Sequence, residues 1–254
     1  MPSSYAHFRF GDRALPGLAG EFRKPIQQHR RLYDLGQQGP DFFFFYRLGQ
    51  DTPVRKLARQ YHYTPGGEVF GRICRELAHP TEAELAYLYG LLGHYCLDSV
   101  CHPLVNQRAE SGLEHNAMES EFDRFLLERD GIAKPYRYNR GRLLQCSRGH
   151  SRVIARFYPE AEEVQIHRSL STMSTVLGLL TVHAGAKQVL HLMGGAHPGL
   201  LMGKEPDVRY TQSNRELLEL FRQSQVRYRD CLQQLNSHLY DRKPFGKEFQ
   251  AIFG

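Results

Sequence analysis

The chain has 254 residues, of which 41% are hydrophobic and 24% charged, and it carries a net charge of +6 with neutral histidines. These values are ordinary for a globular protein. The longest apolar stretch, around residues 173–180, is too short to span a bilayer. The basic excess suits an anionic substrate such as a phosphodiester or a phospholipid, although a solvated basic surface is the commoner explanation.

Helical patterns follow one another along the chain, and no alternating strand pattern of any length interrupts them. Pro25 suits the first turn of a helix that Gly36 ends, and Thr81 with Glu84 forms a capping box for a long helix. Pro103 is expected to kink or end that long helix. The predicted helices span residues 25–36, 53–62, 68–78, 82–102, 113–129, 141–157, 162–180, 184–193 and 214–239.

These patterns predict an all-α fold in a single domain of residues 1–254. Residues 1–130 contain the candidate ligands, and residues 131–254 form a second helical half. Glycine and proline residues predict a long loop near 194–213, and Ser213 or Asn214 is expected to cap the helix that follows it.

The five cysteines form no CxxC pair, and most of them lie in apolar or helical sequence. They are predicted to be small core residues of a protein in a reducing compartment. The first 17 residues contain no apolar segment of the signal-peptide type. Together these features favour a cytoplasmic location.

Five consecutive aromatic residues, 42–46, follow a Gly-Pro turn and Asp41. One interpretation is a buried aromatic plug beneath a loop. The other is a carboxylate held at the edge of an apolar wall, where its pKa and its orientation are set by the surroundings. The sequence favours the two interpretations about equally.

Imidazole and carboxylate groups recur at helical spacing between residues 94 and 119. His94, Asp98 and His102 are four residues apart, as are His115 and Glu119, so each set shares one face of a helix. Two crossing helices would direct these groups to a common point. Imidazole with carboxylate, and without thiolate, is the ligand set expected of a hydrolytic zinc site.

Other histidines carry no such signal. His7 and His62 are unremarkable as single residues, since a lone histidine is more often a core or helix-end residue than a ligand. A further set has no acidic residue at ligand spacing and is not expected to bind metal: His150, His167, His183, His191, His197 and His238.

Taken together, His94-xxx-Asp98-xxx-His102-Pro103, His115-xxx-Glu119, the upstream Gly39-Pro40-Asp41 and the early His7 resemble the zinc-dependent phospholipase C family. This family is related to the fungal single-strand-specific zinc nucleases, and the closest likeness is to small bacterial members. The resemblance covers about residues 1–130. It implies an all-helical domain around a cluster of zinc ions.

The resemblance also implies a ligand set for each ion. Asp41, His62, His94 and Asp98 would hold one zinc ion, with Asp98 bridging to a second ion that His7 and the N-terminal residue complete. The remaining ion would be held by His102, His115 and Glu119. Secreted relatives begin with a tryptophan that binds zinc, and this chain contains no tryptophan, so two or three ions are expected.

The implied function is a zinc-dependent phosphodiesterase that hydrolyses a phospholipid through attack of a zinc-bound water. Asp41 would be both a ligand and the candidate catalytic base, and Phe42 and Phe44 would contact the substrate. A small phosphodiester or phospholipid is the expected partner, with peripheral contact to a membrane; nucleic acid is a less favoured partner, and the oligomeric state is not predicted.

Two alternatives stay open. One is a single-strand nuclease with the same metal architecture, supported by the aromatic residues and the basic charge. The other is a non-catalytic metal-binding helical protein. A phosphohydrolase of the His-Asp type is disfavoured, because the sequence contains no His-Asp dipeptide.

Overall fold

The computed structural model describes residues 4–181, 199 and 201–254. Within these ranges all regular structure is helical, apart from one isolated antiparallel bridge between Pro65 and Ile252. The all-α prediction is therefore confirmed. The elements are α1 Ser4–Ala14, η1 Leu15–Gly17, α2 Gly20–Gln28, α3 Arg30–Gly36, η2 Gly39–Phe45, α4 Pro53–His62, α5 Gly66–Glu76, α6 Glu82–Arg108, α7 Gly112–Arg129, η3 Pro135–Arg137, η4 Arg140–Leu144, α8 Arg148–Ala155, α9 Glu163–Leu179, η6 Val208–Tyr210, α11 Thr211–Asp241 and η7 Lys247–Phe249.

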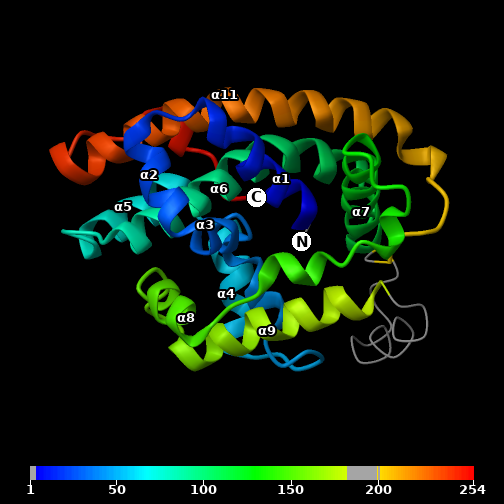
Figure 1. Ribbon diagram of the computed structural model, residues 1–254, viewed down its shortest axis with the longest axis horizontal. Helices are drawn as coiled ribbons and strands as arrows, with labels where there is room; N and C mark the ends of the chain where they lie inside the picture. The colour runs from blue at the N-terminus through cyan, green and yellow to red at the C-terminus, as the bar shows by residue number, and fades with distance from the viewer. Residues whose placement is uncertain (1–3, 182–198, 200) are drawn as a thin grey trace.

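Helix α6 is the interior element of the fold, packed against α3, α11, α2, α1 and α7. It begins with the predicted capping box, in which the Thr81 amide donates to Glu84 Oε2 at 2.8 Å and the Glu84 amide donates to Thr81 Oγ1 at 3.2 Å. Residues 86–98 are all buried, because this helix is apolar on every side. Figure 1 shows α6 inside the bundle, with α11 along one side and α9 at the opposite edge of the view.

Helices α3 and α6 touch backbone to backbone at two glycines. A Cβ atom on Gly90 would overlap the carbonyl oxygen of Tyr33, and one on Gly36 would lie 2.9 Å from the Cα atom of Gly90. Only glycine allows this close approach. The contact sets the position of α3 and of the loop that follows it.

Substitution Gly90→Ala is therefore expected to lower the free energy of unfolding by about 3 kcal/mol or more, because rigid backbone atoms block the added methyl group. The matched control is Gly112→Ala, at the first residue of α7, where a Cβ would meet nothing within 4 Å. Denaturant unfolding of the two variants measures the difference. Equal stability of both variants would contradict the close crossing.

Several predicted helix boundaries are wrong. The predicted helix 25–36 is two helices, because the chain breaks at His29 and Pro25 lies inside α2. Helix α6 passes through Pro103 to Arg108, since a proline removes only one helical hydrogen bond and Val105 is buried in the core. The predicted helix 141–157 is η4 followed by α8, which Ser147 caps.

The last helix also differs from the prediction. Helix α11 begins at Thr211 with Tyr210 at its N-cap position, so neither Ser213 nor Asn214 caps it. The predicted helix 184–193 and residues 194–198 and 200 of the predicted loop 194–213 lie outside the described residues. In the rest of that loop, residues 201–207 are irregular, whereas η6 and the first turn of α11 occupy 208–213.

All five cysteines are free, and four of them are buried, as predicted for small core residues: Cys74, Cys96, Cys101 and Cys231. The described helices include none with the length and apolar character needed to cross a membrane.

Candidate metal centre

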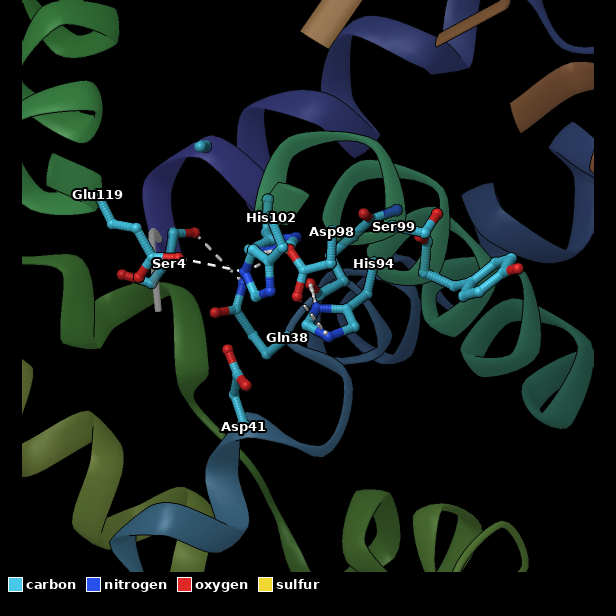
Figure 2. Close-up of polar contacts among 12 residues, drawn as sticks. Ser4, Gln38, Asp41, His94, Asp98, Ser99, His102 and Glu119 are labelled. Atoms are coloured by element: carbon cyan, nitrogen blue, oxygen red, sulfur yellow. Dashed lines mark hydrogen bonds and ion pairs between the residues drawn. The ribbon is translucent and has the colours of Figure 1, made fainter. Parts of the chain in front are cut away.

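The residues predicted as metal ligands converge from five helical elements. His7 comes from α1, Asp41 from η2, His62 from α4, and the remaining ligands from α6 and α7. Those remaining ligands are His94, Asp98, His102, His115 and Glu119. All of these residues are buried except His115, whose side chain is 18% exposed. Figure 2 shows Asp98 between His94 and His102 on α6, with Asp41 and Glu119 directed to the same region.

The carboxylate of Asp98 lies at the centre of this convergence. Its oxygens are 3.0 Å from His7 Nε2, 3.2 Å from His94 Nε2, 3.7 Å from His102 Nε2 and 3.9 Å from His62 Nε2. A single carboxylate thus faces four imidazoles that come from three helices, the geometry expected of a bridging ligand.

The carboxylate of Glu119 organises a second group. Its Oε1 atom lies 3.3 Å from His102 Nε2 and 3.2 Å from His115 Nε2. Because α6 and α7 cross here, His102 lies between the Asp98 group and the Glu119 group. The two sets of helical spacing in the sequence therefore meet, as the sequence predicted.

Ligand atoms close enough to share an ion form three groups within the described residues: His7 with Asp41 and His94; His62 with His94 and Asp98; and His102 with His115 and Glu119. The second and third groups agree with the ligand sets that the resemblance implies. The first differs, because it places Asp41 and His94 with His7. The assignment of each ligand to an ion stays a prediction.

Three of the imidazoles have Nδ1 against an oxygen atom and Nε2 facing the carboxylates. The Nδ1 atoms of His62, His94 and His115 lie 2.5 Å from Ala58 O, 3.2 Å from Gln37 O and 3.1 Å from Asn106 Oδ1. Donation from Nδ1–H to these oxygens leaves Nε2 as the ring's lone-pair atom. Metal-ligating histidines are held in this way by their outer partners.

Several candidate ligand atoms have no hydrogen-bond partner among the described residues, as expected if they bind a cation. The buried Nε2 atoms of His62 and His94 and the Oδ1 atom of Asp41 make no hydrogen bond to any group in the part of the chain that the structure describes. His62 Nε2 is nevertheless 3.0 Å from Asp41 Oδ1. These two atoms are close to each other but do not form a hydrogen bond. Buried acceptor atoms in such an arrangement are typical of ligands that share a metal ion.

The pKa values keep these groups in the ligand form. Burial lowers the pKa of His94 to about 4, so its ring is neutral near pH 7. Burial by itself raises the pKa of Asp41 and Asp98, but nearby positive charges outweigh it, and for Asp98 these are the charges of the imidazoles. The pKa of Asp41 falls to about 2, and that of Asp98 falls well below its usual value. Both carboxylates are therefore ionised at neutral pH.

Two residues outside the predicted ligand set position Asp41 and His7. Gly39 has a φ of 50°, and a Cβ there would overlap the ring of His94, so η2 can approach α6 only through a glycine. Asp123 on α7 is buried and accepts hydrogen bonds from the amides of Tyr5 and Ala6 at 3.1 and 2.8 Å. It thereby fixes the first turn of α1, from which His7 projects.

The aromatic residues after Asp41 combine the two predicted roles, a buried plug and an apolar wall beside the site. Phe42 is fully buried and packs on Phe43 and Tyr158, so it has no exposed surface with which to contact a substrate. Phe44 is partly exposed, and the centre of its ring is 5.8 Å from that of His62. The run is thus a core plug at Phe42 and a wall beside the metal centre at Phe44.

The groups that hold the histidine ligands in place are harder to predict from local sequence. The carbonyl of Ala58 is one helical turn before His62, so helix geometry could have indicated it. Gln37 holds His94 from 57 residues away, and Asn106 holds His115 from nine residues away, across the turn between α6 and α7; the sequence analysis singled out neither. The three described histidines not expected to bind metal, His150, His167 and His238, belong to none of the candidate ligand groups.

Buried imidazoles and carboxylates without thiolate are a donor set that suits a hydrolytic zinc site, and here an all-helical fold holds them. The chain belongs to the zinc-dependent phospholipase C family: the family's model matches residues 6–165, which include every candidate ligand. No curated protein and no solved structure matches the chain. Membership of this family supports a zinc-dependent phosphodiesterase in broad terms.

Proposed function

We propose that this protein is a zinc-dependent phosphodiesterase that hydrolyses a phospholipid. The observation that carries the proposal is the Asp98 carboxylate, which faces four imidazoles within 3.9 Å inside a buried site. Eight side chains would hold two or three zinc ions: His7, Asp41, His62, His94, Asp98, His102, His115 and Glu119. Cytoplasmic location and peripheral contact with a membrane belong to the same proposal.

Zinc at such a site supplies Lewis acidity: it offsets negative charge on phosphoryl oxygens and lowers the pKa of a coordinated water. Asp41 is the group proposed to orient the attacking water and to accept its proton. Its low pKa makes it a positioning carboxylate at neutral pH and a weak base. Phe44 excludes water on the His62 side of the centre.

A cavity of about 340 Å³ beside Phe44 supports an anionic substrate. Its lining residues are Phe44, Asp51, Arg55, Lys56 and Arg59. Lys56 is paired with Asp51 at 3.0 Å, and Arg55 donates to the carbonyl of Phe44 at 3.1 Å. The cavity thus has three cationic side chains and one carboxylate. This excess of positive charge favours binding of the phosphate group of a phosphodiester beside His62.

The test compares substrates and metal content. Protein purified without added metal is expected to contain two or three zinc ions per chain by elemental analysis, fewer in His115→Ala, and to hydrolyse phosphatidylcholine in vesicles. Hydrolysis of single-stranded nucleic acid alone would identify the nuclease alternative. Zinc without hydrolysis of either substrate would identify a non-catalytic metal-binding protein, and a folded protein that takes up no zinc would overturn the proposal.

Substitution Asp41→Asn is expected to lower kcat by about 10²- to 10⁴-fold, because the amide can neither accept the proton nor carry the charge. Most of the zinc should remain, since the other ligands persist. The matched control is Asp241→Asn, an exposed carboxylate at the end of α11 that lies outside this cavity, which should keep both zinc and kcat. Loss of zinc together with activity would assign Asp41 a mainly structural role.

A further inference from the structure

The last residues of the chain run alongside the end of α4, where His62 lies. The amide of Gly66 donates to the carbonyl of Ala251 at 2.9 Å, and the amide of Phe253 donates to Thr64 O at 3.3 Å. The amide of Gly254 then donates to the carbonyl of His62 itself, at 3.1 Å. Figure 1 shows this end of the chain in the middle of the bundle beside α6. Backbone hydrogen bonds thus guide residues 251–254 into the metal centre.

Phe253 reaches a second ligand. Its side chain is fully buried, and its ring centre lies 5.0 Å from that of Tyr95 and 5.5 Å from that of Phe70. The ring of His94 is 6.2 Å away. Phe253 therefore backs the face of α6 that carries the ligands, and it limits how far the His94 ring can tilt.

Gly254 lies next to a third candidate ligand, His102, and this position has no space for a side chain. A Cβ on Gly254 would lie 2.5 Å from Nδ1 of His102 and 3.2 Å from Cδ2 of His62. These two rings are nearly parallel, with planes 10° apart and centres separated by 6.3 Å. A residue larger than glycine at position 254 therefore requires a shift of the His102 ring or of the segment that lies against it.

His62 and His102 belong to different candidate ligand groups. The distance between their rings therefore affects how far apart the two bound ions would lie. In two-metal hydrolytic sites the ions are about 3.5–4 Å apart, and displacements of about 0.5 Å in the ligands are already harmful. A rigid backbone segment against both rings is a direct means of holding that spacing.

We propose that residues 251–254 are a positioning element of the metal centre, in which Gly254 sets the separation of His62 and His102 and Phe253 orients His94. This inference rests on the zinc centre of the proposed function. It adds a device that the ligand motifs do not contain, because the segment lies more than a hundred residues beyond the last of them, Glu119.

The test is the zinc affinity of Gly254→Ala, measured by competition with a chromophoric chelator, together with the visible absorption spectrum of the cobalt-substituted protein. Affinity is expected to fall about 10- to 100-fold at one or more sites, the range found when groups that support a ligand are changed. The cobalt spectrum should shift, because the coordination geometry changes. The metal-free variant should unfold within about 2 °C of the metal-free wild type.

The matched control is Ile252→Ala, in the same segment, whose side chain is 42% exposed. It should leave affinity and spectrum unchanged. If Gly254→Ala does not fold, Phe253→Leu takes its place and is judged by zinc affinity and cobalt spectrum alone, because the loss of a buried ring also lowers stability. Wild-type affinity and spectrum in the test variant would overturn the inference, as would equal losses in test and control variants. Absence of zinc or hydrolysis in the wild type would instead overturn the proposed function, and that outcome is seen before any variant is compared.

Discussion

Substitution Asp98→Asn is expected to disrupt zinc binding and to remove most of the hydrolytic activity. Zinc content should fall by at least one ion per chain, and hydrolysis should fall by at least about 10²- to 10³-fold. The reason is the position of this carboxylate, which is within 3.0–3.9 Å of four ring nitrogens. An amide there would bring N–H donors toward atoms that must bind metal, and it would remove the one negative charge that all four imidazoles share.

Elemental analysis and hydrolysis assays on the purified variant measure both effects. The control is Asp130→Asn, which removes a carboxylate outside the centre that accepts hydrogen bonds from Arg9, Arg13 and Tyr5. This variant should keep its zinc and lose about 1 kcal/mol of stability, as expected for a partly exposed ion pair. Full zinc content in Asp98→Asn would contradict the bridging position of Asp98.

Removal of zinc from the wild type is expected to lower the Tm by about 8–16 °C. An ion present at a thousandfold excess over its Kd stabilises the folded state by about 4 kcal/mol, and for a chain of this size each kcal/mol shifts the Tm by about 2–4 °C. Without metal, Asp41 and Asp98 remain buried beside imidazoles that cannot all pair with them. Calorimetry before and after treatment with a chelator measures the shift.

Readdition of zinc should restore the Tm, and magnesium should not, because imidazole ligands select zinc. The His115→Ala variant should show a smaller shift on chelation, since it lacks a ligand of the Glu119 group. A wild-type Tm that chelator leaves unchanged would show that the buried cluster is stable without metal, contrary to the proposed centre.

Local spacing in the sequence predicted those parts of the centre that lie on one helix. His94, Asp98 and His102 share a face of α6, and His115 and Glu119 share a face of α7, because residues four apart in a helix lie one above the other. The capping box at Thr81 likewise marked the start of α6. These predictions held because each depends on neighbours within one or two helical turns.

Features that depend on neighbours elsewhere in the chain were not predictable in this way. Pro103 was expected to end α6, yet tertiary packing carries the helix through it. Phe42 and Phe44 look alike in the sequence, but the 3₁₀ turn buries one in the core and leaves the other beside His62. His7 and His62 gave no signal as single residues, and only the family resemblance singled them out.

The sequence by itself thus determined an all-helical chain and two ligand motifs, each confined to a single helix. The tertiary structure decided how those motifs meet: Gly39 allows Asp41 to approach His94, Asp123 anchors α1 beneath His7, and Gly254 lies against His62 and His102. The physical reason is the range of the forces involved. Helix periodicity follows from the backbone geometry of adjacent turns, whereas the distance between two helices is set by close contacts among residues far apart in the chain.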